Sequence, residues 1–214
     1  FMQNGNYILS GKPYIINKNN PKIDSSFELK PIQSRYLFSL FRWKNIIGFH
    51  TRNVPHKAHE YIQKKAIEIS NADAIYISPV TGKKKSGDFL SKPIIECYNK
   101  LIKESFYTPA EAVIGTFNTY SRYSGPREAV FTAICRKNYG CNYFIIGRDH
   151  TGVGDYYKPD ESLKMFDKLD LGLNILSFNT VAYNKDIKRV SEISSSNSKN
   201  NLSSISGSII RDQL

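Results

Sequence analysis

The chain has 214 residues, which is enough for one α/β domain with short appendages. A hydrophobic core of this size is stable without disulfide bonds or bound metal ions. Its formal net charge of +11 indicates a negatively charged partner, such as a nucleotide or an inorganic anion. The basic residues are scattered and no apolar run approaches the roughly 18 residues of a membrane span, so we expect neither nucleic-acid nor membrane binding. Three cysteines without a Cys-x-x-Cys pair are typical of a reducing, cytoplasmic location.

Strands and helices alternate through the middle of the chain. After residues 1–35, which we interpret as the tail of a β-rich N-terminal domain, a buried strand is expected at 45–49. A helix is expected at 54–70, with Asn53 as its N-cap and Pro55 in its first turn. Further strands are expected at 74–77, 112–117, 142–146 and 175–178, and further helices at 93–106 and 126–138. This alternation predicts an α/β fold over residues 36–183, with a parallel sheet and helices on both of its faces.

The last part of the chain, residues 184–214, has a different composition. Serine, asparagine and lysine dominate between residues 191 and 208, which is typical of a solvated linker. Residues 205–211 have the composition of a helix that begins but is not completed. We therefore expect a linker followed by an incomplete C-terminal segment.

All four histidines lie in two short runs, and each run directly follows a predicted strand. In a parallel sheet, ligands bind at the carboxyl ends of the strands. His56 and His59 are three residues apart at the start of a predicted helix, whose N-terminus attracts phosphate. A His-x-x-His pair alone is more often an ordinary helix surface, but Arg52 and Asn53 at the strand–helix junction favour an anion site.

The second run combines Arg148, Asp149 and His150 with several glycines, which allow the backbone to approach a ligand closely. The alternative interpretation is an ordinary glycine-rich turn capped by Asp149. Arg127 could contact phosphate or form an ion pair with an acidic residue. The lysines at 83–85 could contact phosphate or simply lie in a solvated loop.

A metal site formed by His56, His59 and His150 is disfavoured, because no cysteine or carboxylate is placed to complete a tetrahedral set. The residues by themselves therefore predict a nucleotide-phosphate site in an α/β fold, and nucleotidyl transfer as its chemistry.

Four runs closely resemble motifs of the ATP sulfurylase (sulfate adenylyltransferase) family. They are residues 48–60 (GFHTRNVPHKAHE), 123–129 (YSGPREA), 136–141 (RKNYGC) and 146–155 (IGRDHTGVGD). Weaker similarities occur at 31–35, 87–88 and 205–211, and the resemblance covers about residues 27–183. It implies a Rossmann-like nucleotidyltransferase fold of the HUP type. It also implies that a sulfate oxygen attacks the α-phosphorus of Mg·ATP in line, giving adenosine 5′-phosphosulfate and pyrophosphate.

The resemblance implies roles for the first run. Thr51, Arg52 and Asn53 match a triplet that acts at the reaction centre, where Arg52 would hold sulfate and the transferring phosphoryl group. His56 and His59 match the histidines that steady the β and γ phosphates as pyrophosphate leaves.

The same comparison implies roles for later residues. Thr151 takes the place of an alanine whose backbone N–H contacts sulfate, and Val181 falls where a residue lines the adenine pocket. Arg148 joins the catalytic group. The implied ATP-binding residues are His50, Thr51, Arg52, Asn53, His56, His59, Gly147, Arg148, Asp149, His150 and Val181, and the implied sulfate-binding residues are His50, Arg52 and Thr151.

The chain also departs from the family pattern. His50 replaces a glutamine that contacts sulfate, and Ser78 replaces the histidine of a His-Pro pair. The cysteine/histidine zinc cluster of many bacterial relatives has no counterpart after residue 183, so we expect no zinc, and Mg²⁺ only as part of Mg·ATP. Because the preceding domain is represented by its tail and the C-terminal segment stops early, we expect a catalytic core.

Two alternatives stay open. A sister nucleotidyltransferase would keep the phosphate-binding residues and use another oxyanion or a phosphonate as acceptor, and His50 is the feature that favours it. A nucleotide-binding module with little turnover would not require Arg52, Asn53, His56, His59 and Arg148 together. The sequence leaves open whether the protein forms a homo-oligomer.

Overall fold

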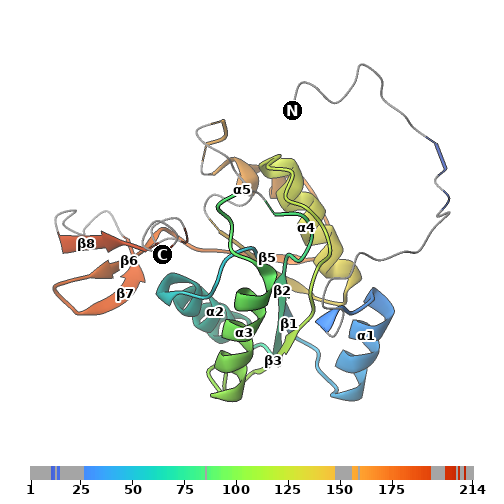
Figure 1. The fold of residues 1–214 in the computed structure, drawn as a ribbon, viewed down its shortest axis with the longest axis horizontal. Helices are drawn as coiled ribbons and strands as arrows, with labels where there is room; N and C mark the ends of the chain where they lie inside the picture. The colour runs from blue at the N-terminus through green and yellow to red at the C-terminus, as the bar shows by residue number, and fades with distance from the viewer. Residues whose placement is uncertain are drawn as a thin grey trace.

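A five-stranded parallel sheet forms the centre of the computed structural model (Figure 1). The structure describes residues 11–12, 14, 27–84, 86–147, 156–158, 160–193, 201–205, 207 and 210. In spatial order the strands are β3 (Glu111–Ile114), β2 (Ala74–Pro79), β1 (Ile46–Thr51), β4 (Tyr143–Ile146) and β5 (Asn174–Ser177). The parallel α/β fold of the HUP type is therefore confirmed.

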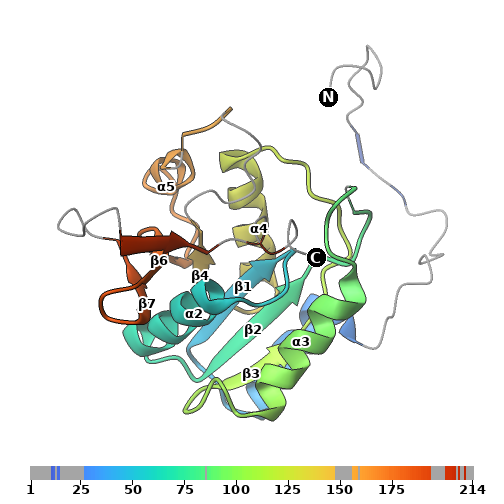
Figure 2. The same ribbon diagram turned by 60° about the vertical axis from the view of Figure 1, so that its left-hand side comes forward.

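Helices cover both faces of this sheet, as the two views in Figures 1 and 2 show. The helices are α1 (Pro31–Leu40), α2 (Lys57–Ser70), α3 (Ser91–Lys103), α4 (Pro126–Asn138) and α5 (Glu161–Phe166). Helices α2 and α3 share one core cluster with the sheet, whereas α1 and α4 pack on the opposite face, with α5 beside α4. None of the described helices is long and apolar enough to cross a membrane.

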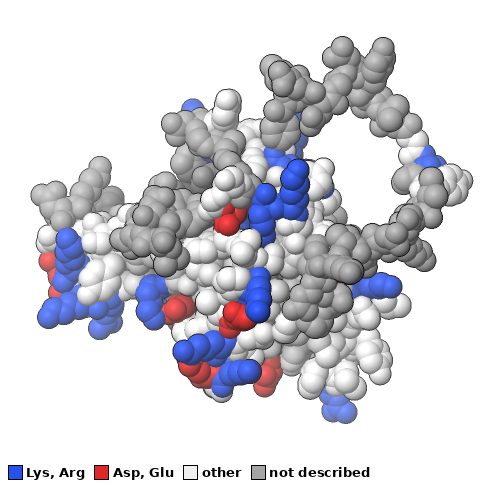
Figure 3. Space-filling model, viewed as in Figure 1, with Lys and Arg blue, Asp and Glu red and all other residues white. Residues whose placement is uncertain are grey.

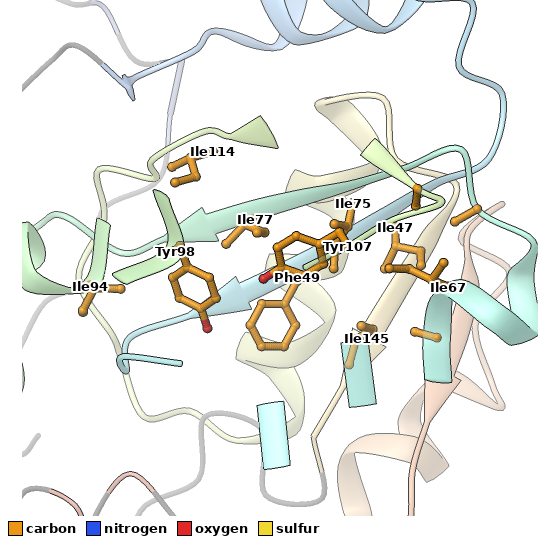
Figure 4. Packing of buried hydrophobic residues seen from close by; sticks show 13 residues of the cluster. Ile47, Phe49, Ile67, Ile75, Ile77, Ile94, Tyr98, Tyr107, Ile114 and Ile145 are labelled. Carbon is orange, nitrogen blue, oxygen red and sulfur yellow. The ribbon is translucent and has the colours of Figure 1, made fainter. Parts of the chain in front are cut away.

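The buried strands carry apolar side chains on both faces, as expected of a parallel sheet covered on both sides. Ile47 and Phe49 of β1 point toward α2 and α3, together with Ile75 and Ile77 of β2. Figure 4 shows these side chains in one cluster with Tyr98 and Tyr107. On the opposite face, the core cluster formed by Phe38, Ile46, Ala74, Tyr76 and Cys141 packs beneath α1.

The chain reverses its direction across the sheet next to β1. Strands β1, β2 and β3 run outward in sequence order, and β4 then returns to the other side of β1. The β1–β2 ladder runs from Ile46↔Ala74 to Thr51↔Pro79. The β1–β4 ladder contains Ile47↔Tyr143 and Gly48↔Phe144 and does not continue to the ends of the strands. A crevice at such a reversal, at the carboxyl ends of the strands, is the ligand-binding position of open α/β sheets.

A buried arginine of α4 passes directly beneath β1. The side chain of Arg136 is 0% exposed, its Nη1 donates to Oγ of Ser78, and its guanidinium lies 4.3 Å from the ring centre of Phe117. A Cβ atom at Gly48 would lie 2.9 Å from Cγ of Arg136 and 3.3 Å from Sγ of Cys141. Glycine at position 48 is therefore what allows this close approach.

We expect Gly48→Ala to lower the free energy of unfolding by about 1–3 kcal/mol, because the added methyl group overpacks the core beneath β1. Chemical denaturation measures this change. A double-mutant cycle with Arg136→Ala identifies the cause, since the cost must shrink when the arginine side chain is removed. An equal cost in both backgrounds would contradict this explanation.

A second, antiparallel sheet lies beside α2 (Figure 1). It consists of β7 (Arg189–Glu192), β6 (Val181–Asn184) and β8 (Leu202–Ser204), in this spatial order. The prediction of a solvated linker from 191 to 208 was therefore wrong for the strand residues among them. Ladder hydrogen bonds to β6 stabilise these polar segments, which a pattern of apolar side chains does not reveal.

Several predicted boundaries shift. Strand β3 ends at Ile114, whereas Thr116 and Phe117 form isolated bridges to Glu28 and Val80. The expected limit between residues 35 and 36 falls inside α1, a helix for which the sequence analysis made no prediction. The division of the chain into domains stays a prediction.

Candidate active site

The turn after β1 is fixed by a buried threonine. Thr51 is 4% exposed, and its Oγ1 accepts a hydrogen bond from the Asn53 backbone N–H at 3.1 Å and donates to the Asn53 carbonyl oxygen at 3.1 Å. Such a side-chain turn holds the backbone in a non-helical path. Arg52 and Asn53 are thereby held at the carboxyl end of β1, where the sequence predicted them.

Helix α2 begins later than predicted. Its N-cap is His56, with extended backbone angles (φ −145°, ψ 169°), and its Nδ1 accepts from the backbone N–H of His59 at 3.4 Å. The prediction of Asn53 as the cap was wrong, because Pro55 disfavours helical angles at the preceding Val54. Since Nδ1 of His56 accepts a hydrogen bond, its ring proton is on Nε2.

His56 and His59 are stacked on each other, with ring centres 3.8 Å apart and an angle of 22° between the planes. Burial lowers the pKa of His56, and the neighbouring Glu60 opposes this. Burial lowers the pKa of His59 to about 3, the charge of His56 adds to the effect, and a hydrogen bond with the Val54 backbone opposes it. Both imidazoles are therefore neutral at physiological pH. His56 can bind a phosphate oxygen as an uncharged donor, whereas the single ring N–H of neutral His59 is used by the Val54 backbone.

A buried hydrogen-bond network supports these groups from below. The hydroxyl of Tyr98 lies 3.5 Å from Nδ1 of His59 and also bonds with Thr51 and Gln63. Tyr107 donates to Oε1 of Gln63 at 3.1 Å. Burial raises the pKa of Tyr98, so its hydroxyl stays protonated. Figure 4 shows Tyr98 and Tyr107 in the core between α3 and the sheet. The sequence analysis missed this network, which joins the end of β1 to the second histidine.

Two cavities open where β1 and β4 separate. The first, of about 180 Å³, is lined by residues from both strand ends, including His50, Thr51, Arg52, Asn53, His59 and Gly147. The second, of about 340 Å³, adjoins it and is lined by residues including Asn53, His56, Gly147, Phe178, Val181 and Ile205. The structure thus gathers the described part of the predicted site around one crevice. Arg148, Asp149, His150 and Thr151 lie outside the described residues.

A cavity of about 800 Å³, larger than either of these two, lies elsewhere. It lies between the outer side of α2, Phe106, Pro109 and Val190, and includes none of the predicted site residues. The described residues contain no group of three or more His, Cys, Asp or Glu side chains that could hold a metal ion. The expected lack of zinc stays a prediction, because His150 lies outside the described residues.

The C-terminal segment reaches the crevice. Ser204, Ile205 and Gly207 line the larger cavity, and a Cβ atom at Gly207 would lie 2.7 Å from Cγ of Asn53. The sequence analysis missed this contact, because residues 191–208 were interpreted as a linker. The only signal was the weak family similarity at 205–211.

The fold and the crevice define a Rossmann-like α/β domain of the HUP type, with its ligand-binding crevice between β1 and β4. A family model described as ATP-sulfurylase matches residues 25–214, and the chain belongs to this family. This membership agrees with the resemblance of the two histidine runs.

Similar proteins extend the comparison. A sulfate adenylyltransferase of Pyrococcus abyssi is 42% identical over 182 residues, which cover 85% of this chain and 47% of that protein. A sulfate adenylyltransferase of Synechococcus sp. is 43% identical over 185 residues, covering 85% of this chain and 46% of that protein. The chain thus spans about half the length of the curated relatives it matches. A solved structure of a hexameric APS kinase from Thiobacillus denitrificans matches with a TM-score of 0.65 and 17% identity, covering 91% of this chain and 36% of that one. At this identity the match shows the fold alone.

We expect Gly207→Ala to reduce turnover, because the added methyl group displaces the side chain of Asn53. A displacement of about 1 Å at a reacting group costs up to about 10²-fold in rate. Steady-state kinetics measure the change, and Gly11→Ala is the matched control, since a methyl group there meets nothing within 4 Å. Unchanged kinetics in Gly207→Ala would mean that Asn53 tolerates the shift.

We expect the His59 ring to stay neutral between pH 8 and about pH 5. Its pKa of about 3 in the folded chain lies below the ordinary histidine value of 6.5, so the unfolded chain takes up the proton first. The stability contributed by this group is complete above pH 6.5 and is lost as the pH falls toward 3. Nitrogen-15 NMR of the imidazoles measures the titration, and a His59 midpoint near pH 6.5 would contradict the burial argument.

Proposed function

We propose that this chain transfers the adenylyl group of ATP to sulfate, giving adenosine 5′-phosphosulfate and pyrophosphate. The observation that carries the proposal is the crevice between β1 and β4, where Thr51, Arg52 and Asn53 face Gly147 beside the stacked neutral pair of His56 and His59. Membership of the ATP-sulfurylase family supports the same chemistry. The three cysteines are free thiols, in keeping with a cytoplasmic location.

The larger cavity suits the nucleoside. Phe178, Val181 and Ile205 offer an apolar surface for adenine, while Asn53 and His56 lie toward the phosphates. This agrees with the family role of Val181. The N-terminus of α2 contributes backbone N–H groups and a partial positive charge for the β and γ phosphates. In the proposal, Nε2 of His56 donates to these phosphates, while His59, which is hydrogen-bonded to the Val54 backbone, holds the His56 ring in place by stacking. Arg148, Asp149 and His150 complete the ATP site.

The smaller cavity suits the acceptor. Arg52 supplies a planar guanidinium that can bind two oxygens of a tetrahedral oxyanion, and His50 lies on the same cavity. Thr151 is proposed to add its backbone N–H. A sulfate oxygen forms a bond to the α-phosphorus while the bond from that phosphorus to the bridging oxygen of the leaving pyrophosphate breaks. Sulfate is already an anion, so no proton must be removed from the nucleophile.

Catalysis in this proposal comes from position and charge. Arg52 neutralises the charge that builds up on the transferring phosphoryl group, and neutral His56 donates to the departing pyrophosphate. Such transfer depends on alignment and on preorganised donors more than on covalent chemistry. Mg²⁺ enters with ATP as part of the substrate, where it neutralises phosphate charge.

A second acceptor class is favoured by one observation. His50 lines the acceptor cavity, and its ring centre lies 6.1 Å from that of Phe117 in an edge-on arrangement. An imidazole is wider than the glutamine side chain of the family pattern and offers one N–H donor when neutral. The alternative is therefore a nucleotidyltransferase for another oxyanion or a phosphonate.

The test is pyrophosphate release from Mg·ATP with sulfate, selenate, molybdate and phosphonates as separate acceptors. We expect release with sulfate and its analogues, and a loss of about 10²–10³-fold or more in Arg52→Ala, the usual cost of removing one preorganised donor. Arg127→Ala is the matched control, since Arg127 is exposed at the start of α4 and lines neither crevice cavity.

Each failure of this test has a distinct meaning. Pyrophosphate release with a phosphonate but not with sulfate would mean that the acceptor is a phosphonate. His50→Gln should then restore the use of sulfate. No release with any acceptor, in a chain that still binds ATP, would favour the nucleotide-binding module. Unchanged turnover in Arg52→Ala would remove Arg52 from the reaction.

A further inference from the structure

A small basic cavity adjoins the acceptor side of the crevice. It has a volume of about 200 Å³ and is lined by residues including Arg52, Lys83, Lys84, Asp88 and Tyr123. It shares Arg52 and Ser121 with the crevice cavity that holds His50. The loop between β2 and α3 supplies both lysines, to which the proposed reaction assigns no role.

The charges around this cavity are unbalanced. Arg52, Lys83 and Lys84 face one carboxylate, that of Asp88. The ion pairs found among the described residues include none of these three cations. On the face drawn in Figure 3, basic side chains gather over the loops above the sheet. A concave surface with excess positive charge concentrates small anions.

The groups around the cavity are held in place. The guanidinium of Arg52 lies 4.9 Å from the ring centre of Tyr123, whose hydroxyl donates to Oδ2 of Asp88 at 3.3 Å. Nζ of Lys84 donates to the Val80 carbonyl oxygen at 2.5 Å. This bond uses one of the three ammonium protons, and the other two are available to a ligand.

Lys84 also carries a charge that an anion would stabilise. The residue is half-buried, and burial lowers the pKa of its ammonium group to about 8; Arg52 adds to this effect, whereas Asp88 opposes it. A bound dianion would stabilise the charged ammonium group. It would thereby offset the cost of burying that charge and its repulsion by Arg52. A lysine in a solvated loop would be neither half-buried nor close enough to an arginine for its pKa to be lowered.

We propose that this cavity is a binding subsite for a tetrahedral inorganic oxyanion, in which Lys84 and Arg52 hold a sulfate-like dianion beside the reaction centre. This inference rests on the proposed function for the identity of the anion. A shared arginine allows the anion to move from the subsite to the crevice without losing its strongest partner. The terminal phosphates of a nucleotide have similar chemistry, so the test must separate the two sources.

The experiment is isothermal titration calorimetry of the full chain with sodium sulfate, without nucleotide and at constant ionic strength. We expect Lys84→Met to weaken sulfate binding by about tenfold, the usual effect of losing one charge-assisted hydrogen bond. Asp88→Asn should tighten binding, because it removes the opposing negative charge and keeps an oxygen for the Tyr123 hydroxyl. Lys103→Met, an exposed lysine in the last turn of α3, controls for net charge.

Weaker sulfate binding in Lys84→Met together with tighter binding in Asp88→Asn supports the subsite, because a purely structural defect would weaken binding in both variants. Equal sulfate affinity in Lys84→Met and Lys103→Met would overturn it. A parallel titration with pyrophosphate separates the sources: if Lys84→Met weakens only pyrophosphate binding, the cavity belongs to the leaving group and the inference is wrong. Sulfate binding that depends on Lys84 in a chain without turnover would keep the subsite and overturn the proposed function instead.

Discussion

The separation of β1 from β4 beyond Gly48 is the constraint on which the site depends. Strand β1 keeps its ladder to β2 as far as Thr51↔Pro79, while its pairing with β4 stops at Gly48↔Phe144. Continued pairing would close the crevice and leave no room for a ligand between Thr51 and Gly147. Arg136 fills the space beneath β1 at this point, so the strand is supported from below while its end stays open.

The stacked histidines show how two imidazoles can lie side by side inside a folded core. Two imidazolium rings at 3.8 Å would repel each other strongly, and burial adds a further cost for each charge. The structure avoids both costs by keeping His56 and His59 neutral, with Tyr98 beneath the second ring. Positive charge is instead provided by Arg52 at the rim and by the partial charge of the α2 N-terminus. The two rings are therefore held rigidly, and the guanidinium of Arg52 remains in reach of solvent.

Local sequence patterns predict most of the helices and strands. The contacts between residues far apart in the sequence cannot be predicted in this way. Helix α4 occupies its predicted residues because Pro126 begins it and Gly140, with a φ of 102°, follows its C-cap Tyr139. The start of α2 was misplaced because the effect of Pro55 on the preceding residue outweighed the good capping chemistry of Asn53. Tyr98 contacts His59, 39 residues apart in the sequence, and Gly207 lies against Asn53, 154 residues apart (207 − 53). No periodicity or motif encodes contacts of that kind, so only the folded chain reveals them.

The two departures from the family pattern are neighbours in the sheet. His50 and Ser78 are register partners on β1 and β2, and in-register residues of parallel strands point to the same face. The family pattern has an amide at the first position and an imidazole at the second, whereas this chain has an imidazole at the first and a hydroxyl at the second. Oγ of Ser78 accepts from Arg136 and donates to the Gly115 carbonyl oxygen at 2.8 Å. An imidazole at Ser78 would have to remain neutral beside that guanidinium. The exchange therefore keeps one imidazole on this face and moves it by one strand, from beside the buried Arg136 to the wall of the cavity that we propose for the acceptor.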